Sequence, residues 1–174
     1  MKYAPSRTYL TAYKSPVGDL TLASDGENLT GIWFDGQRHD RTTVGADAAK
    51  EEALPVFKLT RKWLDIYFSG KNPSFTPPLR VYGSDFRRLV ADIMLTISFG
   101  KTMTYGEIGR EVARRMGRPH MSAQAVGGAV GHNPIGIIIP CHRVIGANGS
   151  LTGYAGGLER KIFLLRNEGI GEFL

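Results

Sequence analysis

The residues that could do chemistry gather around the single cysteine of the chain, Cys141, which His142 and Arg143 follow directly. Before it lies an uncharged, β-branched run, residues 135–139, with a proline on each side. Such a run is typical of a short buried strand, and a proline at its end places the next residue at an edge or a bend. We therefore predict a short buried strand leading to Cys141, and a thiol positioned as a nucleophile would be.

The cysteine has a second interpretation, because a free cysteine is most often a small buried hydrophobe. Neighbouring residues on an extended chain point to opposite faces, so His142 contacts the sulfur only where the chain bends. The setting nevertheless favours a reactive thiol, since positive charge beside a cysteine lowers its pKa from about 8.5 toward neutrality. We expect the cationic residues that follow Cys141 to have this effect.

The segment before the cysteine predicts three helices. Ser84 is a good N-cap for an amphipathic helix. Residues 104–107, TYGE, have the spacing of a capping box that opens a second helix. Ser122 caps a third, residues 123–131, which consists almost entirely of small side chains. A helix, a break and a short helix together have the outline of a helix-turn-helix.

The charge of this region favours nucleic-acid binding. Beyond the capping box, the second helix and the break after it carry the arginines Arg110, Arg114, Arg115 and Arg118, with only Glu111 to offset them. These could be an ordinary solvated face, but the whole chain has 22 basic and 16 acidic residues, a net charge of +6. Helix 123–131 has few side chains that read base edges, so its smallness suits sequence-independent docking.

The first half of the chain predicts a small α/β domain. Turn residues separate three β-prone runs, which we expect to form a three-stranded antiparallel sheet: 9–13, 20–23 and 29–34. Residues 37–50 lack periodicity and are expected to be a loop, whereas 53–68 are expected to form a helix. The fold class is therefore α+β, with a mainly helical C-terminal part.

A proline-containing stretch, residues 71–83, indicates a linker. We place the domain boundary there, with 1–83 as an N-terminal α/β domain and linker and 84–174 as the DNA-binding domain that carries the reactive cysteine. After the cysteine, the glycine-rich residues 152–157 lack the lysine and spacing of a phosphate-binding loop, so no nucleotide site is expected.

The closing helix, residues 158–167, is expected to place Leu158, Ile162 and Leu165 inward. Glu168 follows at its C-terminus, where a carboxylate is electrostatically unfavourable and calls for a compensating partner. From the residues alone, a surface position is the simpler interpretation for Glu168.

These residues resemble the O6-alkylguanine-DNA alkyltransferases, also called methylated-DNA–protein-cysteine methyltransferases. The resemblance covers roughly residues 84–168. It rests on the block 140–144, PCHRV, with Asn133-Pro134 before it and Gly153-Tyr154 and Gly156-Gly157-Leu158 after it. It implies DNA repair by direct damage reversal, through irreversible, single-turnover transfer of the alkyl group of O6-alkylguanine to Cys141. It also implies docking of the second motif helix in the minor groove.

The resemblance implies a role for each matching residue. Cys141 would attack the alkyl carbon of a flipped base, His142 would accept the thiol proton directly or through a water, and Glu168 would orient His142. Tyr105 would help to rotate the nucleotide, Asn133 would hold the turn before the cysteine, and Tyr154 would line the base pocket. The residues expected to contact DNA or substrate, or to support that contact, are Tyr105, Gln124, Ala125, Asn133, Arg143, Val144 and Tyr154.

One position departs from the family pattern. The family commonly carries an arginine on the second motif helix, inserted where the flipped base was, and that position here is Gln124. The stretch 105–124 is also a few residues longer than the family pattern. We expect Gln124 to enter the base stack more weakly than an arginine would.

The expected partner is double-stranded DNA carrying alkylated bases, and O4-alkylthymine is a further candidate substrate. One cysteine excludes an internal disulfide and a cysteine-cluster zinc site, so we expect no metal. We expect no cofactor either, and the glycine-rich loop gives no sign of a nucleotide cofactor. A reactive thiol and the lack of a long apolar stretch favour a cytoplasmic protein with no membrane partner. We also expect it to be a monomer. Two alternatives remain at this point, namely a Cys-His hydrolase and a non-catalytic helix-turn-helix DNA binder.

Overall fold

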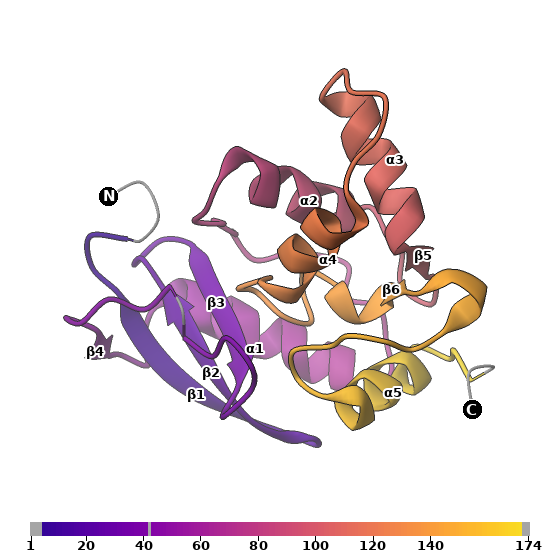
Figure 1. Ribbon diagram of the computed structural model, residues 1–174. Coiled ribbons are helices and arrows are strands. Elements are labelled where there is room, and N and C mark those ends of the chain that lie inside the picture. The colour runs from indigo at the N-terminus through magenta and orange to yellow at the C-terminus, as the bar shows by residue number, and fades with distance from the viewer. Residues whose placement is uncertain (1–4, 42, 172–174) are drawn as a thin grey trace. The chain divides into compact units, whose positions relative to one another are not determined.

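The computed structural model describes residues 5–41 and 43–171 (Figure 1). By its internal contacts the chain divides into two compact units. One comprises the residues up to Gly83 together with Pro134–Gly136, and the other comprises Ser84–Asn133 together with the residues from Ile137 onward. Among the described helices, none is long and apolar enough to cross a membrane.

The first unit is a sheet with one long helix, α1 (Pro55–Phe68). The strands lie in the order β3-β2-β1-β4, and their bounds are β1 (Tyr9–Ser15), β2 (Gly18–Ser24), β3 (Leu29–Phe34) and β4 (Ala49–Lys50). The first three are antiparallel, as the sequence predicts. The core of the unit lies between α1 and the sheet, where Phe57 and Leu64 of the helix are completely buried.

The segment predicted to be a loop, residues 37–50, ends in the fourth strand. β4 pairs in parallel with β1, because Ala49 N donates to Thr8 O (2.9 Å) and Glu51 N donates to Leu10 O (3.0 Å). A two-residue strand has too few positions to show an alternating pattern, and its partner lies about forty residues away in the chain. The pairing therefore left no local signal in the sequence.

The second unit contains the remaining helices and a two-stranded parallel sheet. Its helices are α2 (Asp85–Leu95), α3 (Tyr105–Arg115), α4 (Ala123–Gly131) and α5 (Leu158–Asn167), with the 3₁₀ turns η1 (Cys141–Arg143) and η2 (Ala147–Gly149). Its strands are β5 (Met103–Thr104) and β6 (Val144–Ile145). Helices α2, α3 and α4 pack against one another, which places the short, small-residue helix α4 beside α3 (Figure 1).

The three predicted helix starts are confirmed. The hydroxyl of Ser84 accepts a hydrogen bond from Arg87 N, and Ser122 accepts one from Ala125 N. At α3, both halves of the capping box between Thr104 and Glu107 are present. Each cap satisfies backbone donors that the first helical turn leaves without an intrahelical partner.

The predicted strand before the cysteine is wrong. Within residues 135–139 only Ile135 forms a β-bridge, to Ile32 of β3, and the following residues form a turn. Ile137 has a φ of 68°, a left-handed conformation that a β-branched residue rarely adopts. The four isoleucines are nevertheless buried. The pattern thus indicated burial correctly, but an apolar run alone does not distinguish a strand from a buried turn.

The inward face of α5 also differs from the prediction. Leu165 is buried as predicted, but Ile162 is only half-buried and Leu158 is 50 % exposed, whereas Lys161 and Leu164 are buried. Glu168, which follows the helix, is buried too. These positions follow the spacing i, i+3, i+4 and i+7 of one helix face. The helix therefore turns two charged residues toward the core.

Candidate active site

Cys141 begins the 3₁₀ turn η1 and is nearly enclosed, with 7 % of its surface exposed. Its backbone N–H donates to Ile139 O (2.8 Å), and Arg143 N donates to Pro140 O (2.9 Å). These two bonds bend the chain at the cysteine. The bend is the condition under which Cys141 and His142 can act on one another, because neighbours on a straight strand point apart.

The side chain of Asn133 supports this bend from the end of α4. Its Nδ2 donates to Ile139 O at 2.8 Å, and the amide also hydrogen-bonds the thiol of Cys141. Asn133 is 8 % exposed. One buried amide therefore holds both the turn before the cysteine and the cysteine itself.

Burial raises the pKa of the Cys141 thiol, and the hydrogen bond from Asn133 and the charge of Lys161 only partly offset this rise. The expectation that the charge of the residues after Cys141 brings this pKa toward neutrality is wrong, because burial has the larger effect. Burial lowers the pKa of His142, although Glu168 opposes this, so the imidazole is neutral at rest. A neutral histidine can accept a proton, and a protonated thiol can give one up when the reaction needs the thiolate.

Glu168 is the centre of a buried polar cluster. Its Oε1 lies 2.6 Å from Nε2 of His142, and its Oε2 accepts a bond from Arg143 Nε at 2.8 Å. Arg143 Nη2 donates to Oε1 (3.1 Å), and the backbone N–H of Gly100 donates to Oε2 (3.0 Å). Burial by itself raises the pKa of Glu168, but the bonds from His142 and Arg143 outweigh it and lower the pKa to about 2. Glu168 is therefore a carboxylate.

The charge of Arg143 is directed at this carboxylate and away from the solvent. Besides the two bonds to Glu168, its Nη1 donates to Ile97 O at 2.5 Å. Its guanidinium also lies over the ring of Phe99, 5.8 Å from the ring centre. Arg143 thus fixes the position of Glu168, and Glu168 in turn fixes the ring of His142.

Lys161 is a buried cation in the site that the sequence did not single out. Its side chain is completely buried in α5, and Nζ donates to Val144 O (2.6 Å) and to Thr152 O (3.2 Å). Burial lowers the pKa of Lys161 to about 8, and its interaction with Cys141 opposes this. The signal that would have found it is spacing, because Lys161 and Glu168 lie seven residues apart on one helix face.

Two tyrosines approach the cysteine. The hydroxyl of Tyr105, at the start of α3, lies 3.2 Å from Gly153 O and 3.3 Å from Thr152 O. Burial raises the pKa of Tyr105 and of Tyr154, and both interact electrostatically with Cys141. Gly153 has a φ of +65°, and a Cβ there would lie 3.4 Å from the Tyr105 hydroxyl. The glycine-rich loop therefore closes onto α3 beside the cysteine.

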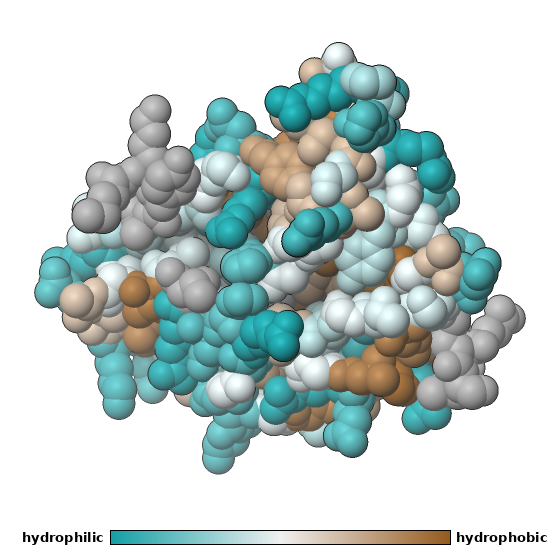
Figure 2. All heavy atoms as spheres, viewed as in Figure 1, coloured by the Kyte–Doolittle hydropathy of each residue, from teal (hydrophilic) through white to brown (hydrophobic). Residues whose placement is uncertain are grey.

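The outer face of the helix pair carries the predicted DNA contacts. Gln124 and Ala125 are exposed on the first turn of α4, and the space beside Gly127 and Gly128 is open. Figure 2 shows hydrophilic side chains around a paler, more apolar patch over α3 and the start of α4.

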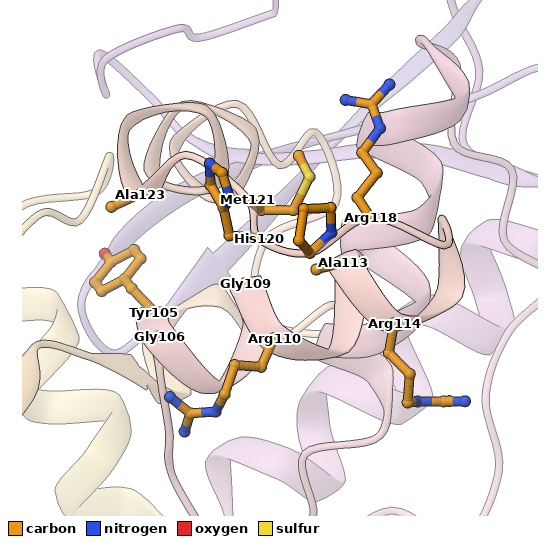
Figure 3. A pocket seen from close by; sticks show the side chains of 11 residues that line it. Tyr105, Gly106, Gly109, Arg110, Ala113, Arg114, Arg118, His120, Met121 and Ala123 are labelled. Carbon is orange, nitrogen blue, oxygen red and sulfur yellow. The ribbon is translucent and has the colours of Figure 1, made fainter.

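A hollow of ≈ 340 Å³ lies between α3 and the turn that precedes α4. Figure 3 shows Arg110 on the Tyr105 side of α3 and Arg114 on the other side, with His120 above the helix. Glu111 pairs with Arg114 and Arg115, each at 2.7 Å, so these two arginines are partly neutralised within the helix. Cys141 does not line this hollow, which belongs to the outer face of the helix pair.

In the part of the chain that the structure describes, no group of three or more His, Cys, Asp or Glu side chains is arranged to hold a metal ion. The sequence-predicted residues Cys141, His142, Glu168, Asn133 and Arg143 come together around η1. Val144 joins them through its carbonyl, and the two tyrosines lie at the edge of this cluster. Gln124 and Ala125 lie apart from it on the exposed face of α4.

Two family models match the chain. Residues 8–81 match the ribonuclease-like domain of 6-O-methylguanine DNA methyltransferase, and residues 85–170 match its DNA binding domain. The methylated-DNA–protein-cysteine methyltransferase of Haemophilus influenzae is 42% identical over 163 residues, which is 93% of this chain and 87% of the relative. The protein of that name from Methanosarcina acetivorans is 42% identical over 161 residues, 92% of this chain and 98% of the relative.

Solved structures agree with this similarity. The crystal structure of the Mycobacterium tuberculosis O6-methylguanine methyltransferase superposes with a TM-score of 0.77 at 41% identity and covers 92% of each chain. The crystal structure of M. tuberculosis OGT in complex with DNA superposes with a TM-score of 0.76 at 41% identity, covering 93% of this chain and 92% of the other.

Proposed function

Because the chain belongs to the 6-O-methylguanine DNA methyltransferase family, we propose that it repairs alkylated duplex DNA by transferring one alkyl group from O6-alkylguanine to Cys141. The observation that carries this proposal is the buried group of residues at η1: a nearly enclosed Cys141, a neutral His142 directly after it in the chain, and a Glu168 carboxylate 2.6 Å from the imidazole. The protein acts as a monomer on a lesion in double-stranded DNA.

The proton of the thiol passes to His142. Glu168 accepts the hydrogen bond of His142 Nε2, so the proton from Cys141 enters at Nδ1, directly or through a water. The imidazolium formed in this way lies against a carboxylate, which stabilises it in a site with little water. Arg143 keeps Glu168 ionised and in place, and so acts as a positioning residue for His142.

The transfer step is a displacement at the alkyl carbon. The Cys141 thiolate forms a sulfur–carbon bond, and the bond between that carbon and guanine O6 breaks with its electron pair going to guanine. Guanine takes up a proton at N1, which balances the proton lost by the thiol. The products are guanine in DNA and a thioether at Cys141. A thioether is not a leaving group under these conditions, so the protein reacts once.

The lesion must leave the duplex to reach Cys141, because the reacting carbon is stacked inside the helix. The exposed small-residue surface of α4 suits docking in the shallow minor groove. Tyr105 at the start of α3 and the loop around Tyr154 then border the path of the flipped base. O4-alkylthymine carries the same alkyl–oxygen bond and is a further candidate substrate.

Two alternatives predict different behaviour. A Cys-His hydrolase would turn over an acyl substrate many times. A helix-turn-helix regulator would prefer one undamaged sequence and would be indifferent to Cys141→Ala. On the exposed first turn of α4, Ala123 and Ala125 offer nothing for base readout and only Gln124 can hydrogen-bond a base edge, which disfavours the regulator.

Peptide mapping tests the proposal. The protein is incubated with duplex DNA containing O6-methylguanine and then digested, and the expected adduct is one methyl group on the peptide that contains Cys141. Cys141→Ser serves as the matched control and is expected to stay unmodified. Methylation of another residue, or of the Cys141→Ser variant, would overturn the assignment of the nucleophile.

A further inference from the structure

The hollow between α3 and the turn before α4 has no role in the proposed transfer. It measures ≈ 340 Å³ and arises where α3 ends. Gly117 there has a left-handed φ of 62°, and Arg118 N donates to Ala113 O at 2.9 Å. These are the features of a Schellman ending, which turns the chain back over the last turn of a helix. Residues 118–121 therefore return across α3 and form the second wall of the hollow (Figure 3).

The floor of the hollow is small and apolar. Gly109 and Ala113 of α3 are buried there, and Met121 of the turn adds a thioether side chain. The rings of Tyr105 and His120 lie toward one end of the hollow (Figure 3). Of the residues that the structure describes, no aspartate or glutamate lines it. An apolar hollow edged by rings suits a nucleobase, because unpaired bases stack on tyrosine and histidine side chains.

The rim of the hollow is cationic. Arg110, Arg114 and Arg118 line it, and all three are exposed. Arg114 pairs with Glu111 at 2.7 Å, and Arg110 interacts electrostatically with Glu107. No ion pair among the described residues involves Arg118. Guanidinium groups bind phosphates, so the rim and the floor together match the two parts of a nucleotide, an anionic phosphate and a flat base.

The hollow adjoins the surface that faces DNA in the proposed function. Ala123 lines it and begins α4, directly before Gln124 and Ala125. Tyr105 lines it as well, and its hydroxyl lies 3.2 Å from Gly153 O of the loop beside the cysteine. A paired base cannot enter such a hollow, because it stays inside the duplex stack. A base without a pairing partner, at the end of a strand or in a gap, can enter it.

We propose that the hollow is a second nucleotide site, which takes one unpaired nucleotide of a DNA strand next to the duplex that α4 contacts. The base lies on the floor beside Met121 and stacks on the ring of His120, and the phosphate lies at the cationic rim. The inference rests on the DNA partner of the proposed function and not on the transfer to Cys141. It gives the protein a preference for duplex that borders single-stranded DNA.

Binding of undamaged DNA tests this site, because no transfer takes place. The probe is a short fluorescent duplex with a tail of unpaired thymidines, compared with the same duplex carrying an abasic tail of equal length. Both tails carry the same charge, so the ratio of the two dissociation constants reports the bases alone. The variants are His120→Ala, which removes the ring, and His120→Phe, which keeps one. Arg118→Met, in the same turn, removes a charge and keeps the ring of His120.

We expect the wild type to bind the thymidine tail about fivefold or more tightly than the abasic tail, which is the lower end of what stacking of one base contributes. His120→Ala should bring this ratio close to one, and His120→Phe should retain it. Arg118→Met should weaken binding of both tails alike and leave the ratio unchanged, because a phosphate contact does not distinguish them. Residues 118 and 120 are exposed, so these variants leave the packing of the fold intact.

Equal affinity of the wild type for the two tails would overturn the proposal, because the hollow would then contact phosphates alone. A ratio that stayed unchanged in His120→Ala, or that fell as far in Arg118→Met, would overturn it too. Displacement of the tailed duplex by thymidine monophosphate at a similar concentration would assign the hollow to free nucleotides instead. Failure of the proposed function would show differently, since wild-type protein would then accept no methyl group from DNA while the ratio still reported on the hollow.

Discussion

The imidazole of His142 and the carboxylate of Glu168 meet at 2.6 Å, with both side chains completely buried. They come from opposite ends of the C-terminal segment, one from η1 and the other from the residue after α5. Arg143 binds the same carboxylate and keeps it ionised. His142 is therefore a neutral base for the proton of Cys141, and Glu168 is a fixed negative charge that stabilises the imidazolium formed when His142 takes up that proton.

Removal of this base should slow the chemistry and spare DNA binding. We expect His142→Ala and Glu168→Gln to lower the single-turnover rate of methyl transfer by about 10²–10⁴-fold, the usual contribution of a positioned general base. Their affinity for undamaged duplex should stay close to that of the wild type. A variant that lost DNA binding but kept its transfer rate would contradict the assigned roles.

Glu168→Ala should affect the fold as well as the chemistry. It leaves the buried Arg143 guanidinium without its carboxylate, and breaking a buried ion pair by removing one partner typically costs about 3–5 kcal/mol. Glu168→Gln keeps one acceptor oxygen and the shape of the side chain, so it should lower the free energy of unfolding less than Glu168→Ala does. Urea denaturation of both variants measures this difference, and equal stabilities would show that the acceptor oxygen kept in Glu168→Gln does not compensate Arg143.

Stability should fall in acid through Glu168. Its pKa in the folded protein is about 2, below its ordinary value of 4.5, so between these pH values the unfolded chain binds more protons. The contribution of this carboxylate is complete above pH 4.5 and is lost as the pH falls toward about 2. The pKa of His142 is also lowered from its ordinary value of 6.5, so this group likewise makes the folded protein less stable as the pH falls below 6.5. Glu168→Gln should flatten the acid limb of the unfolding free energy.

Glu111 provides the matched control for this experiment. Its pKa is also lowered to about 2, by hydrogen bonds from Arg114 and Arg115, but this cluster lies at the surface. At about 1 M salt the Debye length is about 3 Å, so the surface contribution should largely disappear. The difference between wild type and Glu168→Gln should persist in high salt, whereas that between wild type and Glu111→Gln should shrink. Equal salt sensitivity of both would place Glu168 in contact with solvent.

The arginines of the helix pair should contribute unequally to DNA binding. Arg114 and Arg115 pair with Glu111, whereas no ion pair within the described residues involves Arg110 or Arg118. Each phosphate contact contributes about 0.9 to the slope of log affinity against log salt. The double variant Arg110→Met/Arg118→Met should therefore lower that slope by about 2, and Arg114→Met/Arg115→Met should lower it less.

The control for lost net charge is the double variant Lys50→Met/Lys58→Met, which removes the same charge from exposed positions of the first unit. Titrations with unrelated undamaged duplexes should give similar affinities, because phosphate contacts carry no sequence information. Equal slopes for the two arginine double variants would contradict the unequal assignment. A strong preference for one undamaged sequence would favour the regulator.

Gln124 should contribute to base flipping. It is exposed on the first turn of α4, two residues after the cap Ser122, where a side chain can project into a groove. A side chain that fills the gap in the stack recovers part of an unstacking cost of a few kcal/mol. Gln124→Ala should slow repair of duplex DNA, and Gln124→Arg should match or exceed the wild type, because a guanidinium stacks and carries charge.

Free O6-methylguanine base separates this role from a general one, because it needs no flipping. Neither substitution should change the rate on the free base appreciably. Equal effects of Gln124→Ala on duplex and free base, or no effect on either, would remove Gln124 from the flipping step.

Local signals predicted the helices well. The helices α2, α3 and α4 start at caps made by Ser84, Thr104 and Ser122. Each cap binds a backbone group within three residues, so the adjacent sequence is enough to predict it. The turn before the cysteine was not predictable in this way. The isoleucine run favours a strand by composition, but in the structure Asn133 holds a turn and Ile137 is left-handed, and composition indicates neither.

The sequence was enough to predict the reactive residues of the site, but not the charged residues that set their protonation. Cys141 and His142 stand out as a dipeptide, but the partners that set their protonation lie about 20 to 27 residues later on α5 and just beyond it. Glu168 was identified through resemblance, and Lys161 was missed because a lysine in an amphipathic helix normally indicates its solvent face. Only the folded helix shows that both residues are buried and contact the segment from Cys141 to Val144.

The stoichiometry of transfer tests the central claim most directly. The protein is incubated with an excess of duplex containing O6-methylguanine, and restored guanine is counted against protein until the reaction stops. The account predicts a plateau at one guanine restored per protein molecule, with every molecule heavier by one methyl group at Cys141. Continued restoration of guanine beyond one equivalent, or restoration without a methyl group on Cys141, would contradict it.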